Sequence, residues 1–209
     1  MILHGYFRSS AAYRVRIALN MKGLLARQVS HHLRREEQRA PAYLALNPQG
    51  LVPTLITESG AVLTQSLAIL EWLDETHPHP PLLPREPLAR AHVRAFAYAI
   101  ACDIHPVQNL KVLAEVRKLG GEDAAAEWAR RVNQDGLDAC EAMLKDWTGP
   151  FCFGAAPTLA DICLVPQLVN ARRFGADLSR WPKLTAIEAA CKALPAFADA
   201  APENQPDAE

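Results

Sequence analysis

No apolar run in the 209-residue sequence approaches the ~20 residues that a helix needs to cross a bilayer. No secretory or transit segment is visible at the start either, because the apolar stretch ILHGYF is short and charge follows at once. An excess of one charge is also missing, since 22 basic and 23 acidic side chains leave a formal net charge of −1. This balance argues against a general nucleic-acid binder. We expect a cytoplasmic protein with neither membrane nor nucleic-acid partners.

Cysteine is scarce and is not spaced for a known framework. No C-x-x-C pair occurs and the number of cysteines is odd, which argues against a disulfide scaffold and a zinc site and favours a reducing compartment. No other metal site is expected. The sequence also has no G-x-S-x-G elbow, so a serine hydrolase ranks low. The five cysteines are Cys102, Cys140, Cys152, Cys163 and Cys191.

Basic side chains are concentrated near the start of the chain. Residues 1–39 contain eight lysines and arginines, and only Glu36 and Glu37 oppose them. Such a region suits a small anionic ligand. A solvated helix face explains the same charges about as well.

The first part of the chain alternates strand and helix signals. Apolar runs separated by turn residues predict the order β-α-β-α-β-β-α, with a parallel βαβ unit followed by a hairpin and a final helix. Ser66 is expected to cap that final helix. The strands are expected at 2–7, 27–33, 51–57 and 61–64, and the helices at 11–21, 41–46 and from 67 onward.

A proline-dense segment, HPHPPLLPREP at 77–87, interrupts the regular structure. Proline removes a backbone donor and fixes φ, so neither a helix nor a sheet is expected to continue through it. Beyond it almost every segment has helical periodicity, and Thr158 and Asp161 form a capping-box-like start. We expect an α/β domain at 1–82 and an all-helical domain at 88–209. The expected helices are 88–102, 107–119, 122–147, 158–171 and 182–194.

Ser9 and Ser10 stand where the first strand ends and the first helix begins, in FRSSAAYRVRIALN. A helix N-terminus gathers unpaired N–H groups and a partial positive charge, so it stabilises an anion. A serine hydroxyl there can donate a hydrogen bond to a thiolate. A serine at this position is also the ordinary helix cap, and the residues alone favour the cap.

Two further stretches of the first domain have the residue types of a binding site. In LVPTL, Pro53 stands at the start of a strand, where a cis Val52–Pro53 bond would turn the Val52 backbone toward a peptide-like ligand. An ordinary trans proline is the alternative. In TQSLAIL, Gln65 and Ser66 precede a helix and offer a second place for an anion, with a simple cap again as the alternative.

Taken together, these residues resemble the glutathione transferase superfamily, whose first domain is thioredoxin-like and whose second is all helical. The stretch FRSSAAYRVRIALN resembles more narrowly its zeta class, with a motif close to S-S-C-x-x-R-V-R-I-A-L. The resemblance covers the whole chain. It extends to ALNPQGLVPTL, QSLAILEWLDE, CDIHPVQNLKVL, TLADICLVPQ, ARRF and the tail NQPD.

The resemblance implies a glutathione-dependent cis–trans isomerase. Zeta-class enzymes are typically maleylacetoacetate isomerases of tyrosine and phenylalanine breakdown, and close bacterial relatives isomerise maleylpyruvate. In this chemistry a thiolate adds to a conjugated cis double bond, the resulting single bond rotates, and the thiolate leaves to give the trans isomer. Glutathione is needed and is not consumed, and the family also implies a homodimer.

The resemblance also assigns roles to residues by position. It places Ser9 at the thiolate with Ser10 in support. Arg8 and Arg173 match residues that bind substrate carboxylates, with Lys111 as a further charge and Arg172 as the weaker alternative to Arg173. For His105, which precedes a proline, a structural role at a helix kink is the alternative. The positions matching glutathione contacts are Ser9, Ser10, Gln38, Val52, Gln65, Ser66, His105 and Asn109.

One position departs from the zeta-class motif, because Ala11 stands where a cysteine usually follows the two serines. This weakens any inference about side activities and leaves the isomerase interpretation in place. A general glutathione transferase or peroxidase, and a non-catalytic binding protein on the same fold, are the alternatives. Maleylacetoacetate and maleylpyruvate differ mainly in the length of the keto-acid arm, and the sequence does not separate them.

Overall fold

Four short strands form one sheet in the computed structural model, which describes residues 1–209. Their order across the sheet is β2–β1–β3–β4, with β1 parallel to β2 and the other neighbours antiparallel. The predicted parallel βαβ unit and hairpin are thereby confirmed. The strands are β1 (Ile2–Gly5), β2 (Arg27–Ser30), β3 (Thr54–Ile56) and β4 (Val62–Thr64).

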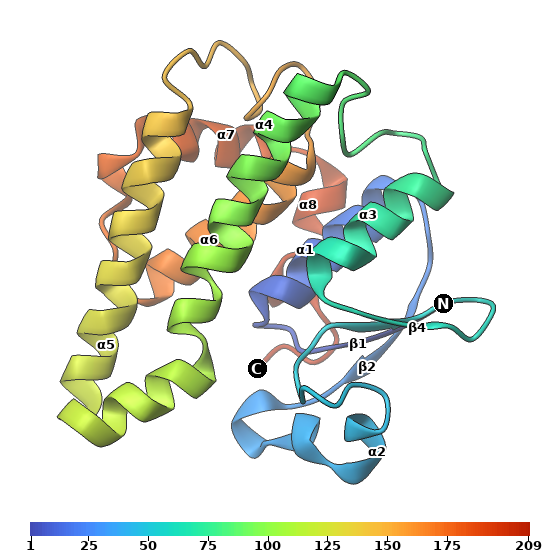
Figure 1. Ribbon diagram of the computed structural model, residues 1–209, viewed down its shortest axis with the longest axis vertical. Coiled ribbons are helices and arrows are strands. Elements are labelled where there is room, and N and C mark those ends of the chain that lie inside the picture. The colour runs from blue at the N-terminus through green and yellow to red at the C-terminus, as the bar shows by residue number, and fades with distance from the viewer. The chain divides into compact units, whose positions relative to one another are not determined.

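Three helices of the same part of the chain pack on this sheet, namely α1 (Ser10–Met21), α2 (Pro41–Leu44) and α3 (Ser66–Thr76). Helices α1 and α3 cover one face, and α2 lies over the other (Figure 1). Alternation along β1 produces this split: Leu3 and Gly5 are buried, whereas His4 is turned toward Tyr43 of α2. A Cβ on Gly5 would lie 3.3 Å from the Cβ of Ala12, so α1 approaches the strand closely.

The strands are shorter than the sequence predicts, and the start of α3 differs by one residue. Strand β2 ends at Ser30 because a 3₁₀ turn, Leu33–Arg35, follows with His32 as its cap. Ser66 was expected as the cap of α3, but Gln65 occupies that position with φ +65° and Ser66 is the first helical residue. Gln65 makes no side-chain cap bond, so the hydroxyl-cap interpretation of Ser66 is wrong.

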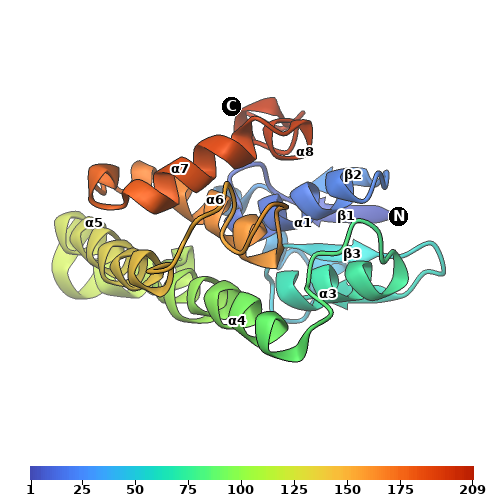
Figure 2. The ribbon, with the colours of Figure 1, turned by 90° about the horizontal axis from the view of Figure 1, so that it is seen from above.

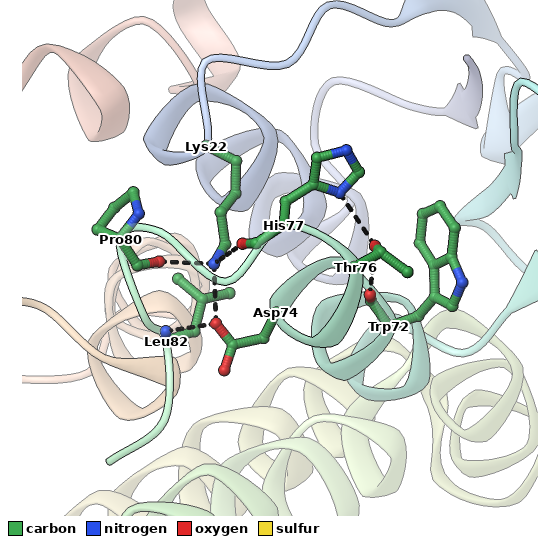
Figure 3. Close-up of polar contacts among 7 residues, drawn as sticks. All are labelled: Lys22, Trp72, Asp74, Thr76, His77, Pro80 and Leu82. Carbon is green, nitrogen blue, oxygen red and sulfur yellow. Dashed lines mark hydrogen bonds and ion pairs between the residues drawn. The ribbon is translucent and has the colours of Figure 1, made fainter. Parts of the chain in front are cut away.

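The proline-dense linker is held to the C-terminal ends of α1 and α3 by one buried lysine (Figure 3). Lys22 Nζ donates to Asp74 Oδ1 at 2.8 Å and to the carbonyl oxygens of His77 at 2.7 Å and Pro80 at 2.5 Å. Asp74 Oδ1 also accepts the Leu82 N–H at 2.7 Å. An ammonium group offers three donors, and a cation is favoured where two helices end.

The last residues of the chain pack with the first domain. The structure divides into unit 1, Met1–Leu82 with Lys192–Glu209, and unit 2, Leu83–Cys191. The short helix α8 (Pro195–Ala198) lies against α1, where Tyr13 Oη donates to the Phe197 carbonyl at 3.2 Å. The sequence-based division placed this segment in the helical domain, since its helical pattern does not reveal its packing partner.

Unit 2 is helical and contains no strand beyond an isolated bridge between Phe151 and Gly154. Its helical segments are α4 (Pro87–Tyr98), a π-helical segment (Ala99–Ile104), a 3₁₀ turn (Pro106–Gln108), α5 (Leu110–Met143), α6 (Leu159–Arg173), a 3₁₀ turn (Leu178–Arg180) and α7 (Pro182–Lys192). None of the protein's helices combines the length and apolar character required to cross a membrane.

Helix α6 is the centre of unit 2. It is buried around nearly its whole circumference and lies between α7 and the pair α4 and α5 (Figure 2). The predicted capping box is confirmed, because Asp161 Oδ2 accepts the Thr158 N–H at 2.7 Å and Thr158 caps the helix in return. The predicted break between 119 and 122 appears as a kink in α5 at Gly121, where φ is +84°.

Candidate functional site

Ser9 is the N-cap of α1 and keeps a proton to donate. Its Oγ accepts the Ala12 N–H at 3.2 Å, while its backbone is extended at φ −70° and ψ 114°. A hydroxyl can accept and donate at once, so the capping bond leaves the O–H available for a negatively charged atom. Ser10 follows as the first residue of the helix and is buried. The same hydroxyl can therefore cap the helix and donate a hydrogen bond to an anion.

Arg8 precedes this cap in the turn after β1. Its guanidinium lies over the Phe7 ring, 5.1 Å from the ring centre, and the residue is half-buried. The arginine thus brings a cation next to Ser9, the residue that caps α1. This placement is compatible with a carboxylate-binding role.

Val52 lies just before the internal strand β3, beyond the last paired residue of the sheet. The ladder between β1 and β3 ends at the pair His4 and Thr54, so the N–H and C=O of Val52 lie outside it. The Val52–Pro53 bond is cis. The preceding carbonyl, that of Leu51, accepts from Tyr43 Oη at 2.6 Å and from Asn47 Nδ2 at 2.7 Å. The buried side chains of Tyr43 and Asn47 therefore fix the backbone immediately before Val52.

The start of α3 is a second place for an anion. Ser66 is buried and its Oγ accepts from Arg14 Nη1 at 3.3 Å, so a buried guanidinium from α1 lies at this helix start. Gln65 Nε2 donates to Gln49 Oε1 at 2.8 Å. The positive end of α3, the Ser66 hydroxyl and the Arg14 charge together favour a carboxylate.

Gln38 lies in a 3₁₀ turn, Glu37–Arg39, beside the loop that leads to Val52. A Cβ on Gly50 would meet the Gln38 carbonyl at 3.3 Å, which shows how closely the two segments approach. The Gln38 Oε1 atom is buried and has no hydrogen-bond partner in the chain. An orphaned acceptor of this kind suits a ligand that brings N–H donors.

Three candidates of unit 2 lie within one short stretch. His105 precedes the 3₁₀ turn Pro106–Gln108 and is half-buried. Asn109 caps α5, with its Oδ1 accepting the Val112 N–H at 3.1 Å, which leaves its amide N–H groups to donate. Lys111 is exposed in the first turn of α5.

Arg173 and Arg172 end α6 but differ in their surroundings. Arg172 forms a two-point ion pair with the buried Glu188, so its guanidinium is engaged within unit 2. Arg173 is exposed, and its guanidinium lies 5.6 Å from the ring centre of Phe174. The pairing with Glu188 engages Arg172, and Arg173 stays the carboxylate-binding candidate that the sequence predicts.

Sequence reasoning missed the residues that support the candidates of unit 1. Tyr43 and Asn47 hold the Leu51 carbonyl, Gln49 bonds Gln65, and Arg14 bonds Ser66. A signal for Arg14 exists in RVRIAL, because a charged residue inside an apolar helical run needs a buried partner. No comparable local signal marks Gln49, whose role depends on a contact with a residue 16 positions away.

A four-stranded α/β unit with two anion-favouring helix starts and a cis-proline turn before β3, followed by a helical unit, defines a glutathione-binding transferase fold. Family models agree: "Glutathione S-transferase, N-terminal domain" matches residues 3–81 and "Glutathione S-transferase, C-terminal domain" matches residues 122–198. The chain therefore belongs to the glutathione S-transferase family.

Within the family, the chain is similar to named isomerases over its full length. It is 51% identical to the maleylacetoacetate isomerase of Rhizobium meliloti, over 97% of this chain and 96% of that protein. The structure of a maleylpyruvate isomerase, described as a bacterial zeta-class enzyme, has a TM-score of 0.96 and 46% identity over all of both chains. A maleylacetoacetate isomerase from Anaeromyxobacter dehalogenans with bound GSH has a TM-score of 0.91 and 46% identity, covering 99% and 97% of the chains.

Proposed function

We propose that the protein is a glutathione-dependent cis–trans isomerase that converts maleylacetoacetate to fumarylacetoacetate. The observation that carries the proposal is the Ser9 hydroxyl, which caps α1 through its oxygen and keeps its proton for a thiolate. The similarity to named isomerases over the whole chain supports the reaction class. We further propose that the protein acts in the cytoplasm as a homodimer, in the breakdown of aromatic amino acids.

The residues of unit 1 fit glutathione, a peptide with a thiol, two carboxylates and several N–H donors. The start of α1 suits the thiolate, the Val52 backbone suits the peptide group, and the start of α3 suits a carboxylate. The orphaned Gln38 Oε1 suits an N–H donor of the ligand. We assign glutathione binding to these groups and to Ser10, Gln65, His105 and Asn109.

Bound glutathione would supply the nucleophilic thiol for addition to the double bond and its later release. The chain's own contribution is electrostatic. Ser9 donates a hydrogen bond to the sulfur and the start of α1 favours its negative charge, so both groups lower the thiol pKa. Arg8, Arg173 and Lys111 are proposed to bind the carboxylates of the substrate, which a planar guanidinium can grip at two points.

A maleylpyruvate isomerase is the second candidate, because one such enzyme shares the fold at a TM-score of 0.96. The experiment is to measure kcat/KM for both substrates with saturating glutathione. We expect both to be isomerised and maleylacetoacetate to have the higher kcat/KM. A higher value for maleylpyruvate would select the second candidate, and failure on both would overturn the proposal.

Substitution of Arg173 by alanine tests the carboxylate-binding role. A charge-assisted hydrogen bond is worth roughly 1.5–3 kcal/mol, so substrate kcat/KM should fall about tenfold or more while glutathione affinity stays within about twofold. The control is Arg130→Ala, which removes a partly exposed arginine that pairs with Glu127 on α5. Loss of glutathione affinity in Arg173→Ala, with substrate KM unchanged, would contradict the assignment.

A further inference from the structure

A four-residue turn, Tyr6 to Ser9, connects β1 to α1 and carries both Arg8 and Ser9. The Ser9 N–H donates to the Tyr6 carbonyl at 3.0 Å, which closes the turn. The orientation of this turn sets the positions from which the Arg8 and Ser9 side chains extend. Groups outside the turn hold it from two directions.

Arg16 of α1 binds the carbonyl side of this turn. Its Nη2 donates to the Phe7 carbonyl at 3.0 Å and its Nη1 to the Tyr6 carbonyl at 3.5 Å. Its Nε donates to the Ala200 carbonyl at 2.9 Å, so the same guanidinium also holds the C-terminal segment. Arg16 is only 4% exposed. Burial lowers its pKa to about 10, which keeps it charged at neutral pH.

Asp207 binds the N–H side of the same turn. Its Oδ2 accepts the Phe7 N–H at 3.1 Å and the Ser30 hydroxyl at 2.5 Å. The Phe7 residue is therefore held at its N–H by a carboxylate and at its C=O by a guanidinium. Asp207 belongs to the tail motif NQPD, which the glutathione-binding candidates do not include.

The tail reaches this position through a regular set of contacts along β2 and its extension. Gln28 Nε2 donates to Gln205 Oε1 at 3.1 Å, and His32 Nε2 lies 2.8 Å from Glu209 Oε1. With Ser30 and Asp207 between them, alternate residues on one side of the strand contact alternate residues of the tail. Gln205 is additionally fixed by bonds to the Asp199 and Ala201 carbonyls.

We infer that Asp207, acting with Arg16, is a positioning residue for the turn that presents Ser9 and Arg8. This inference rests on the proposed function, because it assigns a role to these residues in binding the thiol and the substrate. Neither Asp207 nor Arg16 touches the reacting atoms in this account. Both act through the Phe7 backbone, Asp207 as acceptor of its N–H and Arg16 as donor to its carbonyl. Removing either side chain therefore lets the turn rotate and moves the Ser9 hydroxyl.

Two Asp207 variants test the inference. Asp207→Ala removes the acceptor, and Asp207→Asn keeps an amide oxygen at the same place. In Asp207→Ala we expect hydrogen exchange at the Phe7 amide of the free protein to be about five- to tenfold faster, as for one lost hydrogen bond. The thiol pKa of bound reduced glutathione, measured by thiolate absorbance, should rise by about one unit, a tenfold fall in the acid dissociation constant. Asp207→Asn should restore most of both values.

The matched control is Glu203→Ala, which removes an exposed acid of the same tail. It should leave amide exchange and thiol pKa at their wild-type values. A thiol pKa in folded Asp207→Ala equal to that of the wild type would overturn the inference, as would an equal change in Glu203→Ala. Should alanine prevent folding, a chain ending at Pro206 gives the same comparison, and an unchanged thiol pKa there has the same meaning.

Two further variants test whether Arg16 and Asp207 act together. They are Arg16→Lys and the double variant that combines Arg16→Lys with Asp207→Ala. Arg16→Lys keeps the charge but offers donors from one nitrogen only, so it should raise the thiol pKa in the same direction. If both residues act on the Phe7 backbone, the double variant should change the thiol pKa by less than the sum of the single changes. Simple additivity would contradict a shared action.

These readouts separate the inference from the proposed function. A wild-type protein that binds glutathione as a thiolate but isomerises neither substrate would overturn the function and leave the positioning role standing. A wild-type isomerase whose thiol pKa ignores Asp207 would overturn the positioning role alone.

Discussion

In the proposed function Ser9 combines two roles, because a hydroxyl can accept through its oxygen and donate its proton at the same time. The oxygen accepts the Ala12 N–H, and the proton remains for the ligand. The position after the two serines is Ala11 and not a cysteine, so no protein thiol lies beside them in the sequence. In the proposed function the hydroxyl and the helix start then supply the stabilisation of the thiolate.

Replacing Ser9 by alanine should therefore change both stability and reactivity. Loss of the cap should lower the free energy of unfolding by about 1 kcal/mol. Loss of the donor should raise the pKa of the bound glutathione thiol by about one to two units, because a hydrogen bond to a charged group is worth roughly 1.5–3 kcal/mol. Spectrophotometric titration of bound glutathione measures the second effect.

Thr158→Ala provides the control, since Thr158 caps α6 in the same way and belongs to unit 2. It should lower stability by a similar amount and leave the thiol pKa unchanged. Ser9→Thr keeps both the cap and the donor and should restore the low thiol pKa. A thiol pKa unaffected by Ser9→Ala would show that the cap is the whole role of this serine.

Two histidines form a titratable pair beneath the Val52 loop. His4 Nδ1 lies 2.9 Å from His31 Nε2, and the His31 ring lies 4.3 Å from the Tyr43 ring that supports the Leu51 carbonyl. Burial lowers the pKa of both histidines below the ordinary 6.5. The charge of His31 lowers the His4 pKa further, as does that of Arg27, whereas Glu37 opposes the lowering of the His31 pKa.

The sign of the pH dependence follows from these lowered pKa values. Between the folded pKa and 6.5 the unfolded chain binds more protons, so stability is full above 6.5 and falls as the pH drops through the folded values. We expect denaturant titrations to show this loss in the wild type and a smaller loss in His31→Gln. His92→Gln, at an exposed position of α4, should leave the profile unchanged. An identical profile in His31→Gln would contradict the account.

At the scale of the elements, a buried lysine as well as the prolines fixes the conformation of the linker at 77–87. Lys22 has no exposed side-chain surface and joins the ends of α1 and α3 to the linker through three acceptors (Figure 3). Lys22→Met should lower the free energy of unfolding by about 3 to 5 kcal/mol, because Asp74 loses its cation in a largely buried position. Chemical denaturation measures the change.

Lys118→Met is the comparison for this prediction. Lys118 pairs with Glu115 on the exposed surface of α5, with side chains 70% and 63% exposed. Its loss should change stability by no more than about 0.5 kcal/mol. Equal effects of the two substitutions would show that the buried ammonium contributes nothing particular.

The order of the elements could be predicted from the sequence, but several boundaries could not. Apolar alternation and turn residues located all four strands and the hairpin, because these signals are local. The end of β2 depends on a 3₁₀ turn capped by His32, and the start of α3 depends on Gln65 with positive φ. Both are fixed by contacts that sequence periodicity does not encode.

At the scale of the whole chain, motif resemblance predicts the candidate residues. Only the structure identifies the residues that hold them in place. Ser9, Val52 and Ser66 occupy strand and helix ends that the motifs mark. The packing of the C-terminal segment with unit 1, and with it the contact of Asp207 with Phe7, joins residues 200 positions apart. Contacts of that separation leave no local pattern.

The central claim is that glutathione is a catalyst and not a substrate of this protein. The most direct measurement follows isomerisation of excess maleylacetoacetate with a small, known amount of glutathione, and then determines the free thiol that remains. We predict complete conversion to fumarylacetoacetate with all of the thiol recovered. Conversion that stops when glutathione is exhausted, with a stable conjugate in its place, would contradict the account and identify a conjugating transferase.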